Sequence, residues 1–268
     1  MTTTPNPLEP MGLAVVTGAS TGIGFSLAQD LVRRAFDVVM CAEDQAIHDR
    51  AGKLAQSGRV VVPVQADLSE ASGVQDLYDE VQRQGRAVDV LALNAGIGVN
   101  GRFDETALED DLRLVDLNVR STVHLAKLVG RDMVREGRGR ILVTSSIAAV
   151  APGPFHATYA ASKAFVHSFA EAIRVELKDT GVTVTSLMPG PTDTDFFRRA
   201  DMEDTKVGSG PKDDPDQVAE EGLDALFAGR DSVVAGALRN RVQAEAGTHL
   251  PDKFASALMG RMTKPGSA

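Results

Sequence analysis

Cysteine, tryptophan and long apolar runs are scarce or absent in this chain of 268 residues. Its one cysteine, Cys41, has no partner for an intrachain disulfide, and its apolar neighbours favour a buried thiol in a reducing compartment. No run approaches the ~18 apolar residues of a membrane-spanning helix, so we expect no membrane insertion and a cytoplasmic location. Residues 1–10 lack the basic cluster and apolar core of a signal peptide, and we predict a disordered tail there.

Basic residues are too few for a nucleic-acid-binding surface. The chain has 28 Lys and Arg against 37 Asp and Glu, a formal net charge of -9. Non-specific binding to nucleic acid needs a basic face that displaces phosphate counterions. The low aromatic content also leaves little on which bases could stack. We therefore expect no nucleic-acid partner.

Short runs rich in Val and Leu alternate with longer segments of helical periodicity, which is typical of a parallel sheet whose strands are joined by helices. No linker or repeat divides the chain. We predict a single α/β domain over residues 11–268, a Rossmann-type, doubly wound parallel sheet of about seven strands with helices on both faces. The predicted strands are 13–17, 37–41, 60–65, 88–93, 140–145, 182–188 and 232–235.

Apolar residues at steps of four predict helices, among them one with Ile23, Leu27 and Leu31 and one with Phe165, Phe169, Ile173 and Leu177. Between about 191 and 215 the pattern gives way to Asp, Thr, Gly, Lys and Pro. Irregular segments of that length are unusual in compact α/β domains, and we interpret this one as a mobile substrate lid. A C-terminal extension, about 236–268, has weak helical periodicity and no assigned role.

A glycine-rich turn lies between the first predicted strand and the helix that follows it. Gly18 permits a tight turn, Gly22 lets the backbone approach a pyrophosphate, and Gly24 lets helix and strand pack closely. The free N–H groups of the helix start would then face the anion. A bare structural corner is the alternative for such a turn taken alone.

Tyr159 and Lys163 are four residues apart, one helical turn, and therefore point the same way. A phenol with an unperturbed pKa of ~10 is a poor base at neutral pH, and we expect the neighbouring ammonium to lower the pKa of Tyr159. The pair suits proton exchange with a carbonyl oxygen. For an isolated instance, a helix-surface pair is the alternative.

These features together resemble the short-chain dehydrogenase/reductase family over roughly residues 11–235. The glycine spacing is similar to its Thr-Gly-x-x-x-Gly-x-Gly motif, and Ser146 and Tyr159 match its Ser and Tyr-x-x-x-Lys arrangement. Asp67-Leu68 resembles the pair that contacts adenine, and Asn94-Ala95-Gly96 resembles the Asn-Ala-Gly motif. A helix cap for Asp67 and a turn role for Asn94 are the alternatives.

The resemblance implies an NAD(P)-dependent oxidoreductase that interconverts a small-molecule ketone or aldehyde and an alcohol by hydride transfer. Tyr159 would be the acid and base, Ser146 would steady the carbonyl oxygen, and Lys163 would also hold the nicotinamide ribose. Asn118 would support a water chain that carries protons, with a solvated surface asparagine as the alternative. A homodimer or homotetramer is implied as well.

Cofactor contacts are implied for the glycine turn, the adenine pair, the Asn-Ala-Gly motif, the catalytic pair and a Pro-Gly segment that closes over the nicotinamide. They are Gly18, Ser20, Thr21, Gly22, Ile23, Gly24, Asp67, Leu68, Asn94, Ala95, Gly96, Tyr159, Lys163, Pro189, Gly190, Thr192 and Thr194.

Glu43, after the second predicted strand, is the candidate for cofactor selection. An acid there can bond a ribose hydroxyl and would repel a 2′-phosphate, which favours NAD(H), with NADP(H) as the alternative. Glu43 stands one place later than the Asp of NAD-preferring relatives, so a solvated helix start is the other interpretation.

Two other kinds of enzyme fit poorly. The histidines form no close ligand pair with acidic support for a metal, and no Gly-x-Ser-x-Gly elbow of a serine hydrolase occurs. A catalytically silent nucleotide-binding regulator of the same fold is the remaining alternative. Candidate substrate-facing residues, with core packing as the alternative for each, are Ala148, Phe155, Phe196 and Phe197.

Overall fold

The computed structural model describes residues 10–268. All but the last residue of the predicted N-terminal tail lie outside the described residues. Among those described, no helix has both the length and the apolar character needed to cross a bilayer.

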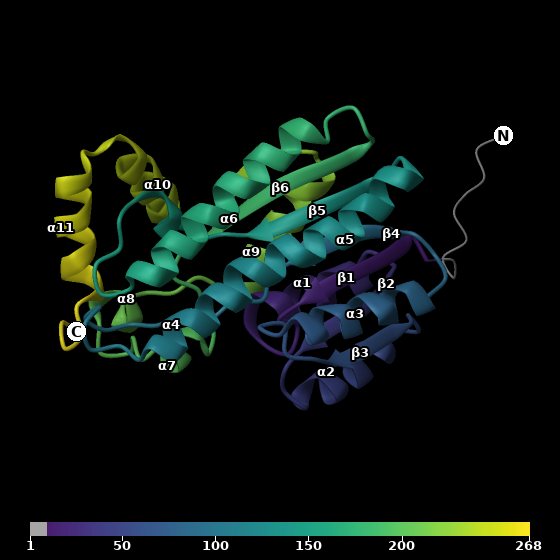
Figure 1. Cartoon of the computed structure of the whole chain (residues 1–268), viewed down its shortest axis with the longest axis horizontal. Coiled ribbons are helices and arrows are strands. Elements are labelled where there is room, and N and C mark those ends of the chain that lie inside the picture. Colours follow the sequence, from purple (N-terminus) through teal and green to yellow (C-terminus); the bar gives the residue numbers. More distant parts are fainter. Residues whose placement is uncertain (1–9) are drawn as a thin grey trace.

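One seven-stranded, fully parallel sheet forms the centre of the molecule, with strand order β3-β2-β1-β4-β5-β6-β7 (Figure 1). This confirms the predicted doubly wound sheet. Each predicted strand is present, with ends that differ by at most one residue. The strands are β1 (Gly12–Thr17), β2 (Phe36–Ala42), β3 (Val61–Gln65), β4 (Val88–Leu93), β5 (Gly139–Thr144), β6 (Val182–Pro189) and β7 (Ser232–Ala235).

The two faces of the sheet bury separate apolar cores because successive strand residues point to opposite sides. Val15 belongs to one core and its neighbour Val16 to the other. Helices α1 (Gly22–Arg33), α2 (Ala46–Ala55) and α9 (Pro215–Phe227) cover the Val16 face, and α3 (Ala71–Arg83), α5 (Ser121–Glu136) and α6 (Ala157–Glu176) cover the Val15 face.

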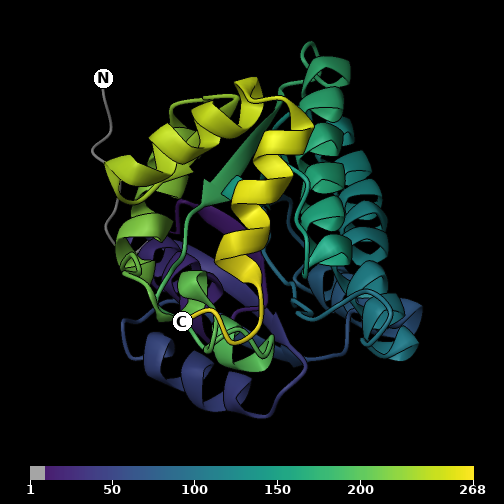
Figure 2. The same cartoon turned by 90° about the vertical axis from the view of Figure 1, so that its left-hand side faces the viewer.

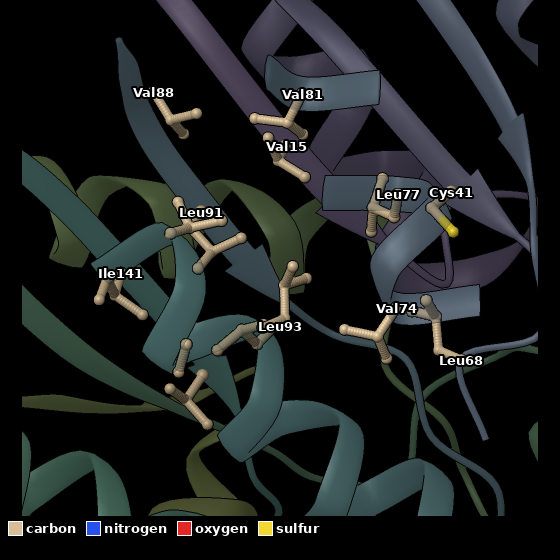
Figure 3. Packing of buried hydrophobic residues seen from close by; sticks show 14 of the residues in the cluster. Val15, Cys41, Leu68, Val74, Leu77, Val81, Val88, Leu91, Leu93 and Ile141 are labelled. Carbon is tan, nitrogen blue, oxygen red and sulfur yellow. The ribbon is translucent and has the colours of Figure 1, made fainter. Parts of the chain in front are cut away.

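Figure 3 shows the Val15 face, where Leu77 and Val81 of α3 lie near Cys41 and Val15 of the sheet. Cys41 is fully buried, and burial raises the pKa of its thiol to about 12.

The helix predicted from steps of four at Ile23, Leu27 and Leu31 is α1, and its Leu27 and Leu31 are fully buried. The helix predicted from Phe165, Phe169, Ile173 and Leu177 is α6, whose C-cap is Leu177. Phe169, Ile173 and Leu177 pack against the Val15 core, whereas Phe165 is exposed. Val166 and Ala170 of α6, each one residue after Phe165 and Phe169, are buried in that core.

The remaining helical segments gather at one end of the molecule (Figure 1). They are α4 (Leu108–Val115), the π-helical turn η1 (Asp116–Arg120), the 3-10 turn η2 (Ile147–Val150), α7 (Phe196–Arg199), α8 (Lys206–Ser209), α10 (Leu238–His249) and α11 (Asp252–Thr263). The segment predicted as an irregular lid thus contains two short helices, with a small apolar core of Phe197, Ala200 and Met202.

Candidate active site

A single cleft at the carboxyl edge of the sheet collects the predicted site. Every residue predicted to contact cofactor or to take part in catalysis lines this cleft, apart from Asn118. The carboxyl ends of parallel strands place the loops after β1, β2, β3, β4, β5 and β6 side by side, which is where ligands bind in open α/β sheets. Residues far apart in sequence, such as Gly18 and Gly190, therefore line the same cleft.

The glycine turn is packed too tightly for larger residues. A Cβ added at Gly24 would lie 2.1 Å from the Gly18 carbonyl oxygen, and one at Gly22 would lie 2.7 Å from Cγ2 of Thr194. Gly18 and Gly22 also adopt φ values of +66° and +54°, which strain other residues. Helix α1 starts without a side-chain cap, so its first N–H groups remain available to an anion. This local structure fits a pyrophosphate.

Asn94 joins two strand ends beside the turn. Its Nδ2 donates to the Thr17 carbonyl at 3.1 Å, and the Thr17 hydroxyl accepts from the backbone N–H groups of Asn94 and Ala95 at 2.9 and 3.0 Å. This geometry supports the turn role that was left open for Asn94. The same contacts hold the start of the glycine turn against the loop after β4.

Asp67 accepts hydrogen bonds from the Ser69 backbone N–H at 2.9 Å and the Ser69 hydroxyl at 2.7 Å. It therefore closes the turn before α3, which begins two residues later at Ala71. Burial acts to raise the pKa of Asp67, but the Ser69 hydrogen bonds and the nearby Arg113 outweigh it and lower the pKa. The carboxylate is thus held in its charged form at the cleft rim.

Arg113 of α4 is a residue that the sequence analysis missed. Its guanidinium pairs with the Glu43 carboxylate and, at 3.2 Å, with the Asp67 carboxylate. The acid proposed to repel a 2′-phosphate therefore has a cation beside it. No local pattern signals this contact, because Arg113 stands 70 residues from Glu43 and only the fold brings them together.

Asp44 was also missed. Its carboxylate accepts from the Ser20 hydroxyl at 2.7 Å and from the Ala46 backbone N–H at 3.0 Å, and it lines the cleft. The Ser20 hydroxyl, predicted to contact cofactor, therefore already has a protein partner.

The catalytic candidates converge where β5 and α6 meet. Tyr159 lies in the first turn of α6 with Lys163 one turn later, and the Lys163 Nζ lies 5.8 Å from the centre of the Tyr159 ring. Lys163 is buried and donates to the Thr144 carbonyl at 2.9 Å. Ser146 caps η2 by accepting from the Ala148 N–H at 3.1 Å, and its side chain also hydrogen-bonds with Tyr159.

The expected lowering of the Tyr159 pKa is wrong for this structure. Burial raises the pKa of Tyr159 to about 12, although a hydrogen bond with Ser146 opposes the rise. Burial also lowers the pKa of Lys163 to about 8. Both shifts have one cause, because a low-dielectric site disfavours phenolate and ammonium alike. Tyr159 is therefore protonated at neutral pH.

Asn118 lies in the π-helical turn η1 and is 2% exposed, so the solvated-surface alternative is wrong. Its Oδ1 accepts from the Ile97 N–H at 2.9 Å, and its Nδ2 donates to the Ile97 carbonyl and the Ser162 hydroxyl, both at 3.0 Å. A Cβ at Gly96 would lie 3.1 Å from Oδ1 of Asn118 and 3.3 Å from Nζ of Lys163. Asn118 thus stands behind Gly96, next to the catalytic pair.

The far end of the cleft has walls from the lid and from the C-terminal extension. Of the candidate substrate-facing residues, Ala148, Phe196 and Phe197 line it, and Phe155 does not. The sequence analysis missed the contributors that come from α10 and α11 and the histidine three residues before Tyr159. They are His156, Gln243, Met259, Met262 and Thr263. Within residues 10–268, no three His, Cys, Asp or Glu side chains form a group that could hold a metal ion.

Comparisons with known proteins agree with this geometry. A family model described as short chain dehydrogenase matches residues 12–205. An uncharacterized short-chain type dehydrogenase/reductase from Sinorhizobium fredii is 34% identical over 200 residues, which covers 73% of this chain and 75% of the relative. An uncharacterized oxidoreductase from Staphylococcus saprophyticus is 32% identical over 216 residues, covering 80% and 90%.

Solved structures give the same result. A short-chain dehydrogenase from Sphingobium yanoikuyae in complex with NADPH superposes with a TM-score of 0.78 at 28% identity, covering 84% of this chain and 87% of that one. An alcohol dehydrogenase from the archaeon Thermococcus sibiricus, complexed with 5-hydroxy-NADP, has a TM-score of 0.73 at 25% identity, with 85% and 97% covered.

Proposed function

The chain belongs to the short-chain dehydrogenase/reductase family of oxidoreductases, and from this premise we propose that it interconverts a ketone or aldehyde and an alcohol, with Tyr159 as acid and base. One observation carries the proposal: Ser146, Tyr159 and Lys163 line the same continuous cleft as the glycine turn. A nicotinamide dinucleotide bound along that cleft would supply or accept the hydride. The glycine turn, Asn94 and Thr194 would hold it.

Ser146 would orient the carbonyl oxygen. Its Oγ accepts from the Ala148 N–H and its side chain hydrogen-bonds with Tyr159, so a substrate oxygen placed beside both residues could take over the Ser146 hydroxyl proton. Donation by Ser146 stabilises the negative charge that grows on this oxygen during reduction.

Tyr159 would then donate its proton to the same oxygen. Its raised pKa keeps the phenol protonated at neutral pH, which is the form that reduction requires. After the transfer, the Lys163 ammonium is the nearby charge that favours phenolate, and Asn118 keeps the loop at Gly96 beside it in place. Alcohol oxidation needs the opposite protonation state, so we expect its rate to rise with pH.

For the cofactor we propose NAD(H), with NADP(H) as the second candidate. Glu43 supports NAD(H), because its carboxylate can accept from ribose hydroxyls. Arg113 supports tolerance of NADP(H), because it offsets the charge of Glu43 and Asp67 at that rim. The relatives from Sphingobium yanoikuyae and Thermococcus sibiricus are complexed with NADPH and an NADP derivative.

The test is the Tyr159→Phe variant, assayed by the absorbance of the reduced nicotinamide with a panel of ketones, aldehydes and secondary alcohols. We expect cofactor binding, followed by fluorescence, to be retained and turnover to fall ~100- to 10,000-fold. Normal turnover by this variant would refute the role of Tyr159. Tight cofactor binding without turnover by the wild type would instead favour the silent nucleotide-binding regulator.

We also propose a cytoplasmic homodimer or homotetramer. The reduced, buried Cys41 is compatible with that compartment, and exposed apolar side chains on α4, namely Leu108, Leu112 and Val115, suit a subunit contact. Size-exclusion chromatography with light scattering distinguishes these states from a monomer.

A further inference from the structure

The substrate end of the cleft is walled by two segments that are remote in sequence. The lid contributes Phe196, Phe197 and Met202, and α11 contributes Met259 and Met262. In Figure 2 the yellow α11 descends toward the green lid helices, and the C-terminus lies beside them. The wall is therefore built from aromatic rings and thioethers, which are apolar and adapt to irregular shapes.

Hydrogen bonds hold α11 against the loop that precedes Tyr159. The Thr263 hydroxyl donates to the Pro154 carbonyl at 2.7 Å, and Asn100 Nδ2 donates to the carbonyls of Phe155 and Thr263 at 2.9 and 3.0 Å. The last residue of α11 is thereby tied to the active-site loop. The methionines of α11 are thus part of the folded cleft, rather than surface side chains that lie over it.

The tail after α11 binds the lid. The Gly266 N–H donates to the Asp204 carboxylate at 2.7 Å, the Ala268 N–H donates to the Asp204 carbonyl at 2.9 Å, and the Lys206 N–H donates to the Ser267 hydroxyl at 3.2 Å. Both walls of the substrate end therefore belong to one connected structure.

Polar groups at this end offer little to a polyhydroxylated substrate. Thr263 is occupied by the Pro154 carbonyl, and Gln243 lies against the Met259 sulfur at 3.9 Å. His156 is buried, and desolvation lowers its pKa to about 4, so the ring carries no charge at pH 7. Its two ring nitrogens have no hydrogen-bond partner in the described residues, but both atoms are buried, so they present almost no polar surface to the cleft. Each substrate hydroxyl that lost water here without a partner would cost about 1–3 kcal/mol.

Charge is also scarce at the substrate end. Apart from Lys163 and the acids of the adenosine end, Arg199 is the one ionised side chain among the described residues that line the cleft, and it is exposed to solvent. The apolar surface begins directly at the catalytic phenol, because the Phe196 ring lies 5.2 Å from the Tyr159 ring between centroids. A group attached to the reacting carbon would therefore meet apolar atoms at once.

From these observations we infer that the substrate is an uncharged ketone or secondary alcohol with an extended apolar substituent, which packs between the lid aromatics and Met259 and Met262 of α11. The inference rests on the proposed carbonyl–alcohol chemistry and specifies the substrate class for that same site. It disfavours sugars, polyols and keto acids as substrates.

Wild-type enzyme tests the inference with three ketones and saturating reduced cofactor: 2-octanone, its chain-length match 7-oxooctanoate, and the ketohexose fructose. We expect kcat/KM for 2-octanone to exceed the other two by at least ~10-fold, since apolar pocket contacts discriminate by such factors. An equal or higher kcat/KM for 7-oxooctanoate or fructose would overturn the inference, the former by pointing to Arg199 as a carboxylate site.

A binding measurement separates this inference from the proposed function. Ketone and oxidised cofactor cannot exchange a hydride, so calorimetric titration of 2-octanone into the enzyme with oxidised cofactor reports binding alone. Binding of 2-octanone but no turnover of any carbonyl would refute the proposed chemistry and leave the substrate-end assignment standing. Failure of 2-octanone to bind, with turnover of polar carbonyls, would refute the assignment alone.

Met262→Glu tests the wall itself, with Leu258→Glu as its matched control. Leu258 is exposed on the same helix and does not line the cleft. We expect Met262→Glu to lower kcat/KM for 2-octanone by ~10-fold or more with unchanged cofactor affinity, and Leu258→Glu to leave it unchanged. Equal losses in both variants would contradict the wall assignment. Thermal melting checks the fold, and if Met262→Glu unfolds, the three-ketone comparison on the wild type decides.

Discussion

Replacing Arg113 with Gln should weaken the binding of NADPH more than the binding of NADH. In the structure Arg113 offsets two acids at the adenosine end of the cleft. Without it, Glu43 and Asp67 would face a 2′-phosphate unopposed, whereas ribose hydroxyls could still donate to the Glu43 carboxylate. The two cofactors should therefore respond differently to one substitution.

The size of the effect follows from exposure. The side chains of Arg113, Glu43 and Asp67 are 46%, 49% and 38% exposed, so water screens their interactions strongly. A unit charge pair at ~4 Å contributes ~1 kcal/mol in water and more where screening is weaker. A loss of about 1–2 kcal/mol corresponds to a ~5- to 30-fold weaker affinity for NADPH. For NADH we expect a change below ~3-fold.

Fluorescence titration of both reduced cofactors measures these affinities. Arg102→Gln is the matched control, because Arg102 also pairs with two acids, Asp104 and Glu105, but does not line the cleft. Exposed pairs contribute ~0–1 kcal/mol to stability, so both variants should melt close to the wild type. The reasoning would be refuted if Arg113→Gln weakened NADH and NADPH equally, or if Arg102→Gln had the same effect.

Two further predictions concern stability. Lys163→Met should abolish activity yet raise the free energy of unfolding at pH 7 by about 1–3 kcal/mol, because it removes a buried ammonium whose pKa is lowered to about 8. For the same reason, the wild type should gain stability as the pH rises from 8 toward 10.5. Denaturant titration measures both effects beside the surface control Lys127→Met, and destabilisation of Lys163→Met at pH 7 would argue against the prediction. Gly24→Ala should lower the free energy of unfolding by about 1–3 kcal/mol and weaken cofactor binding, because its Cβ would lie 2.1 Å from the Gly18 oxygen. Gly52→Ala in α2, where the added Cβ has no atom within 4 Å, should instead raise the free energy of unfolding by ~0.5–1 kcal/mol. Equal shifts in melting temperature for the two variants would contradict this prediction.

Local sequence patterns predict the part of the site that lies at strand ends. The glycine turn, Asp67, Asn94 and Ser146 each follow a strand that a clear apolar run predicts. Because the strands are parallel, these residues can be predicted to lie together at the carboxyl edge of the sheet. The proposed catalytic pair is equally local, because Tyr159 and Lys163 share one helix. These predictions need only the sheet topology, which the alternation of strands and helices already implies.

The features that were missed are those that depend on contacts between distant segments. Arg113 reaches Glu43 and Asp67 because the fold brings its side chain to the loops after β2 and β3. The methionines of α11 reach the cleft because α11 packs beside the loop after η2, to which Thr263 donates. Burial raises the pKa of Tyr159, and burial depends on the whole fold, so the effect of Lys163 alone gave the wrong direction. The apolar periodicity in the sequences of α10 and α11 is too weak to predict this packing.

The cleft is lined partly by residues inside the region that matches the family and partly by residues beyond it. The family match ends at residue 205, just before α8, while α10 and α11 build much of the substrate wall. The proposed catalytic residues and the lid residues Phe196, Phe197 and Met202 lie within the matched region, whereas Met259 and Met262 lie beyond it. Relatives could therefore share the cofactor site and differ in the part of the substrate end that α11 supplies. A chimera that exchanged residues 236–268 would also need compatible acids at Asp204 and Asp213, because Asp204 binds the tail and Asp213 binds Arg239 and Asn240.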